Sequence, residues 1–279
     1  MRLLWSQPLV APPRGLALAR EPGWGLVWDA QHQLSLYNQK GFLQAQRSTA
    51  APCTAIGIAD DGGCAAAGGE LGQLWRLAPD LSTVWQRVLP YRVTAVALSA
   101  LGDYLAATDA SGGLHLFDRH GQVLWKAATP RALYYLTFIP ECPCLMGAAD
   151  FGLVACFDAA GRALWQEGLV SHVGSLAVST QGRQILLACF TEGLVRYTLA
   201  GSRLPQPGQI FPSRLAALSY DGTLILTADL DKGLTLATPE GTVKDRFNLE
   251  SPPVDLALGP LGDYLVVITE MHLLALAVE

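Results

Sequence analysis

The chain has 279 residues, of which 51% are hydrophobic and 15% are charged, with 28 glycines and a formal net charge of −5 at pH 7. This composition excludes a disordered chain, which would have few apolar residues and much more charge. The acidic balance argues against nucleic-acid binding, because phosphate recognition needs a basic face. The values suit an all-β protein with a large core and many tight turns.

At the N-terminus, only three apolar residues follow the positive charge of Arg2 before polar residues begin. A secretory signal needs an apolar stretch of about 7–15 residues, and a membrane-spanning helix needs roughly 18. The sequence contains neither pattern. We therefore expect a cytoplasmic protein that does not insert into a membrane.

Glycines recur every 40 residues in two sets that lie half a repeat apart. The sets are Gly62, Gly102, Gly182, Gly222 and Gly262, and Gly41, Gly121, Gly161, Gly201 and Gly241. Seven such periods account for the 279 residues, and a repeat of this length built from short alternating segments is typical of a β-propeller. We predict one domain over residues 1–279, a seven-bladed β-propeller with about 40 residues in each four-stranded blade.

The third repeat shows the expected unit most clearly. Alternating segments at 93–99, 104–108, 114–118 and 122–126 are separated by short stretches rich in Gly, Asp and Ser. Period-two runs bounded by such turns predict β-hairpins. Four runs in one repeat predict an antiparallel meander, and sheets packed around an axis make the propeller.

Small residues dominate the first predicted strand of each repeat, where the strands converge on the axis. Trp85, Trp125 and Trp165 recur in fourth strands, and we expect them to pack between blades. The fourth strand of the fifth repeat contains Pro205 and Pro207, which cannot donate to a β-ladder. That edge is expected to be frayed or looped.

The last repeat supplies only three strands, at 254–258, 264–269 and 273–278. The segment from Arg2 to Trp5 is similar to 122–125 of the third repeat, with an offset of one residue that a bulge would absorb. We therefore predict that residues 2–8 form the outer strand of the blade made by 253–279, which closes the ring without a free edge.

The run from Gly113 to Asp118, continuing through Gly121 to Trp125, resembles the repeats of WD40-like and quinoprotein-like propellers. The likeness covers the whole chain, although no repeat begins with Gly-His or closes a third strand with Trp-Asp. Asp158, Gly161 and Trp165 are similar to the tryptophan-docking motif of quinoprotein dehydrogenases, with one residue fewer between the Asp and the Gly. The resemblance implies the fold and carries over no catalytic residue.

The six cysteines lie mostly on predicted strands, and without an export signal we interpret them as reduced, buried, small hydrophobic residues. Cys142-Pro143-Cys144 resembles half of a zinc site, but no second pair or nearby histidine completes it. We interpret this segment as a structural turn, and we expect neither a metal nor a cofactor.

Acidic residues stand almost in register at the predicted corners between second and third strands. They are Asp29, Glu70, Asp109, Asp150, Asp229 and Glu270. Neighbouring blades stand about 10 Å apart, too far for shared Ca²⁺ coordination at 2.3–2.6 Å. Each acid is expected to bond to the backbone amides of its own turn, and the alternative is a recognition role for the whole ring.

Basic residues occur in the loops that lead into the blades. They are Arg14, Arg92, Arg131, His172 and Arg214, and cross-loop ion pairs with the corner acids are the simplest expectation. Arg14, Arg214 and Asp255 are the charged residues of the axial strands, and their blades become neighbours when the ring closes. This cluster would hold an anionic group or a partner's acidic side chain, or else neutralise itself. Tyr134 is also predicted at the channel.

No nucleophile elbow, P-loop or metalloprotease motif occurs, and the five histidines lie in separate repeats. We therefore predict a non-catalytic platform for protein partners. Trp24, Trp28 and Trp75 lie off the 40-residue tryptophan register and are candidate docking residues, with core filling as the alternative. The competing function is an enzyme or small-ligand binder that uses the channel mouth around Arg14, Tyr134, Arg214 and Asp255.

Overall fold

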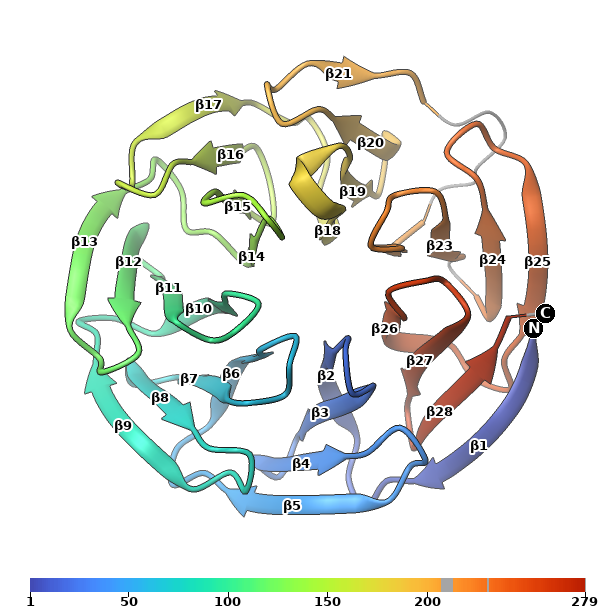
Figure 1. The fold of residues 1–279 in the computed structure, drawn as a ribbon, viewed down its shortest axis with the longest axis horizontal. Coiled ribbons are helices and arrows are strands. Elements are labelled where there is room, and N and C mark those ends of the chain that lie inside the picture. The colour runs from blue at the N-terminus through green and yellow to red at the C-terminus, as the bar shows by residue number, and fades with distance from the viewer. Residues whose placement is uncertain (207–212, 230, 279) are drawn as a thin grey trace.

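Seven four-stranded antiparallel sheets stand around a central axis in the computed structural model, which describes residues 1–206, 213–229 and 231–278 (Figure 1). Each sheet is one blade, and its strands follow one another outward from the axis. The seven-bladed β-propeller predicted from the repeat is confirmed. Within the described residues, no helix is long and apolar enough to cross a membrane.

The first four blades follow the chain without interruption. Blade 1 consists of β2 (Pro13–Ala19), β3 (Trp24–Asp29), β4 (Gln33–Tyr37) and β5 (Leu43–Ser48). Blade 2 consists of β6 (Cys53–Ile58), β7 (Ala65–Gly69), β8 (Gln73–Leu77) and β9 (Thr83–Val88). Blade 3 consists of β10 (Val93–Leu98), β11 (Tyr104–Asp109), β12 (Gly113–Asp118) and β13 (Val123–Ala128). Blade 4 consists of β14 (Tyr135–Phe138), β15 (Leu145–Ala148), β16 (Val154–Phe157) and β17 (Ala163–Glu167).

The last three blades include one short strand and the junction of the two chain ends. Blade 5 consists of β18 (Val173–Val178), the 3₁₀ turn η1 (Thr180–Gly182), β19 (Ile185–Cys189), β20 (Gly193–Tyr197) and β21 (Arg203–Leu204). Blade 6 consists of β22 (Leu215–Leu218), β23 (Ile225–Ala228), β24 (Gly233–Ala237) and β25 (Val243–Asn248). Blade 7 consists of β26 (Pro253–Leu258), β27 (Tyr264–Thr269), β28 (His272–Ala277) and β1 (Arg2–Pro8).

The pairing of β1 with β28 closes the ring, as predicted. Leu3 faces Leu276 and Trp5 faces Ala275, so Leu4 is a bulge. Strand β13 has the same bulge at Leu124. The one-residue offset at the N-terminus is therefore a feature that the fourth strands of other blades share.

Tryptophans of four outer strands join blades 2, 3, 4 and 7 to the blade that follows each of them. The indole Nε1 of Trp125 in blade 3 donates to the carbonyl of Ala159 in blade 4 at 2.8 Å, and Trp5, Trp85 and Trp165 make equivalent bonds to the following blades. A glycine lies under each ring. Gly161 has a φ of +79°, and a Cβ added to it would lie 2.6 Å from the Trp125 ring. The predicted packing of tryptophans between blades is confirmed.

Blade 5 has the shortest described outer strand. Strand β21 spans only Arg203–Leu204, and the carbonyl of Pro205 accepts hydrogen bonds from the side chain of Arg196 where a ladder would otherwise continue. The predicted weakness of this edge is confirmed as far as Gln206, whereas Pro207 lies outside the described residues.

Antiparallel order gives the ring two distinct faces. We call the loop face the side that carries the loops between blades and the corners between second and third strands. The turn face is the opposite side, which carries the first-to-second and third-to-fourth strand turns. The turn η1 belongs to the turn face, which is the one seen in Figure 1.

Candidate functional site

A channel of about 1290 Å³ runs along the axis and is lined by the innermost strands of all seven blades. Its lining has a small residue at the same point of every innermost strand. These residues are Ala17, Gly57, Ala97, Thr137, Ala177, Ala217 and Ala257. Small side chains let seven strands approach the axis, as predicted for the first strand of each repeat.

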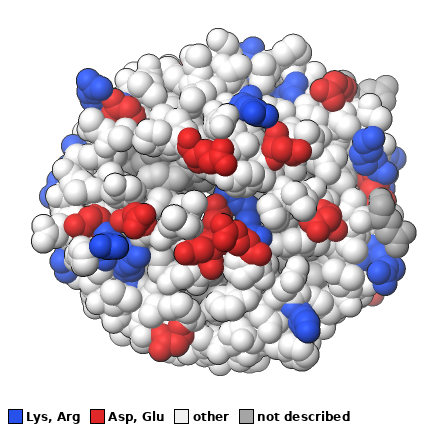
Figure 2. Space-filling view, viewed as in Figure 1, with Lys and Arg blue, Asp and Glu red and all other residues white. Residues whose placement is uncertain are grey.

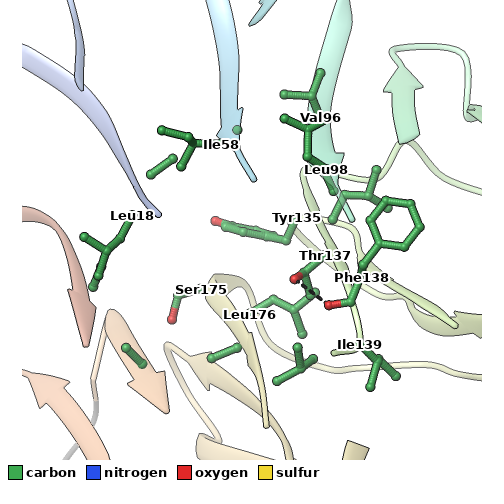
Figure 3. A pocket seen from close by; sticks show the side chains of 18 of the residues that line it. Leu18, Ile58, Val96, Leu98, Tyr135, Thr137, Phe138, Ile139, Ser175 and Leu176 are labelled. Carbon is green, nitrogen blue, oxygen red and sulfur yellow. Dashed lines mark hydrogen bonds between the residues drawn. The ribbon is translucent and has the colours of Figure 1, made fainter. Parts of the chain in front are cut away.

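Large aliphatic residues flank the small ones along the channel. Leu18, Ile58 and Leu176 point into the same open space as the ring of Tyr135 (Figure 3). All four side chains are only half-buried. The channel wall therefore includes an aliphatic stretch that the propeller's own side chains leave uncovered.

Short side-chain bonds join the innermost strands of successive blades around the loop-face mouth. The hydroxyls of Thr54, Thr94 and Tyr135 donate to the carbonyls of Val93, Leu133 and Val173, each in the following blade. Ser175 donates to the carbonyl of Ala216 and accepts from its amide. These bonds, which we call the mouth staples, satisfy backbone groups that a free strand edge leaves unpaired.

Asp255 is the staple between blades 7 and 1. Its carboxylate accepts the amide of Leu16 in blade 1 at 2.9 Å and the amide of Leu256 at 2.8 Å. Burial raises the pKa of Asp255 to about 6, against the two amides and the nearby charge of Arg214, which all favour the carboxylate. A charged side chain on an innermost strand thus has a structural use, which the sequence pattern alone did not reveal.

Arg14 and Arg214 both line the channel mouth beside Asp255, so the structure brings the predicted cluster together. Both side chains are exposed, and within the described part of the chain neither makes an ion pair. The amides, rather than the two arginines, occupy the Asp255 oxygens. The self-neutralising bridge considered from the sequence is therefore not formed as a direct contact.

The remaining predicted mouth residues are divided between the channel and the surface. His172 lines the channel. Arg92 lies outside the lining and pairs with Glu70 at 3.0 Å, as expected of a cross-loop ion pair. Arg131 also lies outside it and stacks over the ring of Phe151 at 5.9 Å.

Tyr134 is exposed and does not belong to the lining, whereas its neighbour Tyr135 does. Side chains alternate along a strand, so a shift of one residue exchanges the two sides of a blade. Tyr135 shares the 40-residue spacing of Ser175 and Asp255, whose side chains also form mouth staples. Counting from those two residues, rather than from Arg14 and Arg214, selects the tyrosine that lines the channel.

The three candidate docking tryptophans pack in the core between blades 1 and 2. Trp75 is buried, and Trp24 and Trp28 are half-buried against the same cluster. Trp75 also forms part of the wall of a second pocket of about 290 Å³, together with Leu71 and Arg47. Core filling therefore accounts for Trp24 and Trp28, while Trp75 still reaches a surface depression.

Three of the six corner acids accept backbone amides of their own turns. Asp29 and Asp229 each accept two backbone amides of the corner that they begin. Asp109 does the same and also bonds to His115 Nε2 at 3.0 Å inside blade 3. Across residues 1–206, 213–229 and 231–278, no three His, Cys, Asp or Glu side chains are grouped to hold a metal ion. The six cysteines are free thiols.

Two surface features were missed in the sequence. Carboxylates gather around the central opening of the turn face (Figure 2), where Asp60, Asp103 and Glu141 belong to the channel lining. The 40-residue spacing of Glu21, Asp61, Glu141 and Asp221 was a signal for this acidic rim.

On the loop face, three apolar pairs lie at three blade junctions. The two residues of each pair lie on adjacent loops, which contact each other through backbone or side-chain atoms. The pairs are Val10 with Met271, Leu71 with Tyr91, and Val170 with Phe190, all exposed. Val10 and Val170 are 89% and 81% exposed, so the fold itself gives these side chains no burial.

Comparison with known proteins adds no further identification. No protein-family model matches the chain, and no curated protein matches it significantly.

Proposed function

We propose that this protein is a non-catalytic platform of the WD40-like type that docks protein partners on its loop face in the cytoplasm. The observation that carries the proposal is the set of three exposed apolar pairs on the loop face. Aromatic residues, Met and Arg are enriched in protein interfaces, and Tyr91, Phe190, Met271 and Arg14 are all exposed on this face. Exposed apolar patches rimmed by polar residues mark interaction sites.

The pocket beside Leu71 and Trp75 supplies an anchor point for the same surface. Interface energy concentrates in a few side chains that fill well-packed pockets, and this depression of about 290 Å³ suits one apolar side chain of a partner. The arginines at the channel mouth favour a partner that carries acidic residues.

The non-catalytic part of the proposal rests on how the polar groups of the channel are used. Thr54, Thr94, Tyr135, Ser175 and Asp255 are all hydrogen-bonded to backbone groups of the propeller. A nucleophilic hydroxyl is instead activated by an adjacent base, whereas the hydroxyls of Thr54, Thr94, Tyr135 and Ser175 donate to backbone carbonyls.

Affinity capture from the native cell, followed by quantitative mass spectrometry, tests the docking face. The double variant Leu71→Ser/Tyr91→Ala is expected to reduce the captured partner at least tenfold. Leu101→Ser/Leu261→Ser is the matched control, since both leucines are equally exposed but lie on the turn face. The proposal fails if the partner is retained by the loop-face variant and lost with the control.

A further inference from the structure

We propose that the central channel binds an amphiphilic carboxylate, a molecule with a linear aliphatic tail and one anionic head. The tail would lie along the axis among the aliphatic residues of the innermost strands, and the head would meet Arg14 and Arg214 at the loop-face mouth. This proposal is separate from the docking of proteins and goes beyond it.

The size and the chemistry of the channel fit an aliphatic tail. Its volume of about 1290 Å³ exceeds the 300–1,000 Å³ of ordinary small-molecule pockets. Leu18, Ile58, Leu98 and Leu176 all line this space and remain half-buried. When an alkyl chain packs against them, apolar surface of the chain and of the channel wall is removed from water. This burial is the main driving force for such binding.

The mouth staples make the channel wall more compatible with an apolar ligand. An unbonded carbonyl facing an alkyl chain is costly, because it loses water without gaining a partner. The carbonyls of Val93, Leu133, Val173 and Ala216 already accept hydrogen bonds from side chains of the preceding blade. The wall therefore has fewer groups that a tail would leave unsatisfied.

The positions of the two arginines point to an anionic head. Staples cross the junctions of blades 2 with 3, 3 with 4, 4 with 5, 5 with 6, and 7 with 1. At the other two junctions, Arg14 of blade 1 and Arg214 of blade 6 stand near the start of the innermost strand instead, with no ion pair among the described residues. Guanidinium groups bind carboxylates through charge-assisted, often bidentate hydrogen bonds.

The charges of the two mouths fix the direction of the ligand. At the loop-face mouth, Arg14 and Arg214 outnumber Asp255 in the lining, and the Asp255 oxygens are already bonded to amides. At the turn-face mouth, the lining contains Asp60, Asp103 and Glu141, and Arg20 is paired with Asp60 at 2.8 Å. An anionic head is therefore attracted to the first mouth and repelled from the second, and a cationic head would show the opposite preference.

Titration calorimetry with monomeric dodecanoate tests the proposal on the whole chain. We expect one dodecanoate per protein, whereas dodecyltrimethylammonium, with the same tail and the opposite charge, binds at least tenfold more weakly. Acetate, which has the head without the tail, is expected not to bind. The proposal is overturned if dodecanoate does not bind, or if the cationic amphiphile binds as tightly.

Variants locate the site. Arg14→Gln/Arg214→Gln should weaken dodecanoate binding at least tenfold, which corresponds to the loss of one charge-assisted contact or more. The matched control is Arg92→Gln, which replaces an arginine of the same face that lies outside the lining. This change should leave the affinity within twofold.

Leu98→Gln should weaken binding of the tail. Unchanged affinity in the double arginine variant or in Leu98→Gln would overturn the assignment to the channel, and both arginines are exposed, so their replacement leaves the core intact.

Discussion

Asp255 forms in blade 7 the staple that blades 2 to 5 make with hydroxyl groups. Thr54, Thr94 and Tyr135 each donate to a carbonyl of the next blade, whereas Asp255 accepts an amide. A carboxylate accepts and does not donate when ionised. The junction between blades 7 and 1 is therefore the one described mouth staple whose strength depends on protonation.

We predict a specific pH dependence for this junction. Because the folded pKa of Asp255, about 6, lies above the unfolded value of about 3.9, the folded state binds more protons between these values. The contribution of Asp255 to the free energy of unfolding should therefore fall as the pH rises from about 4 to about 6, by on the order of 3 kcal/mol.

Urea denaturation of the wild type and of Asp255→Asn at pH 4 and pH 7 measures this contribution. The difference between the two proteins removes the effect of other acids, such as Asp109 and Asp118, whose lowered pKa values act in the opposite direction. Asp255→Asn should gain stability relative to the wild type as the pH rises. Equal differences at both pH values would show that Asp255 does not titrate in this range.

A second residue-scale prediction concerns the glycine under a docked tryptophan. Gly161→Ala places a Cβ 2.6 Å from the Trp125 ring at a φ of +79°, a conformation that costs an L-residue about 1–2 kcal/mol before any collision. We expect the free energy of unfolding to fall by about 2 kcal/mol or more.

Gly168→Ala is the matched control, because a Cβ added there meets nothing within 4 Å. It should change the free energy of unfolding by less than about 0.5 kcal/mol. If chemical denaturation gave similar free energies of unfolding for the two variants, the interpretation that Gly161 leaves room for the indole ring would be contradicted.

Strand β1 is the element on which closure of the ring depends. It contributes the outer edge of blade 7 through its pairing with β28, and Trp5 donates to the carbonyl of Gln39 in blade 1. Met1 adds an ion pair between its amino group and Asp245 of blade 6. One strand thus connects three blades at the junction of the chain ends.

Deletion of residues 1–8 is predicted to lower the melting temperature by more than about 5 °C, since roughly 1 kcal/mol corresponds to 2–4 °C in a chain of this size. It also exposes the edge of β28 and should promote aggregation. Differential scanning fluorimetry and light scattering measure both effects. A synthetic peptide of residues 1–12 should restore part of the lost stability, and an unchanged melting curve of the deleted chain would refute closure by this strand.

The 40-residue repeat was sufficient to predict the blade count, the strand order and the closure, because each element depends on local alternation and turn residues. It also brought Arg14, Arg214 and Asp255 together correctly. It failed at Tyr134, because the next position, which Tyr135 shares with Ser175 and Asp255, is the one that lines the channel in blade 4. It could not reveal the mouth staples, because hydrogen bonds between blades depend on side-chain direction. The acidic rim was visible in the repeat spacing but was overlooked.

The molecule as a whole presents two chemically different faces around one central channel. Carboxylates gather around the channel on the turn face (Figure 2), whereas the loop face carries the exposed apolar pairs, with Arg14 and Arg214 at the channel mouth. Within the described residues, tryptophans or mouth staples cross five of the seven blade junctions. Blades joined in this way present loops that are distant in sequence as one surface, which is what a docking platform requires.

Hydrogen–deuterium exchange of the purified complex with its captured partner tests the central claim, docking on the loop face, most directly. We predict slower exchange in the loop-face segments 8–13, 70–72, 89–92, 168–172 and 190–192, with unchanged exchange in the turn-face segments 59–64, 99–104 and 259–264. Protection of the turn-face segments or of the outer strands, with no change in the loop-face segments, would contradict it.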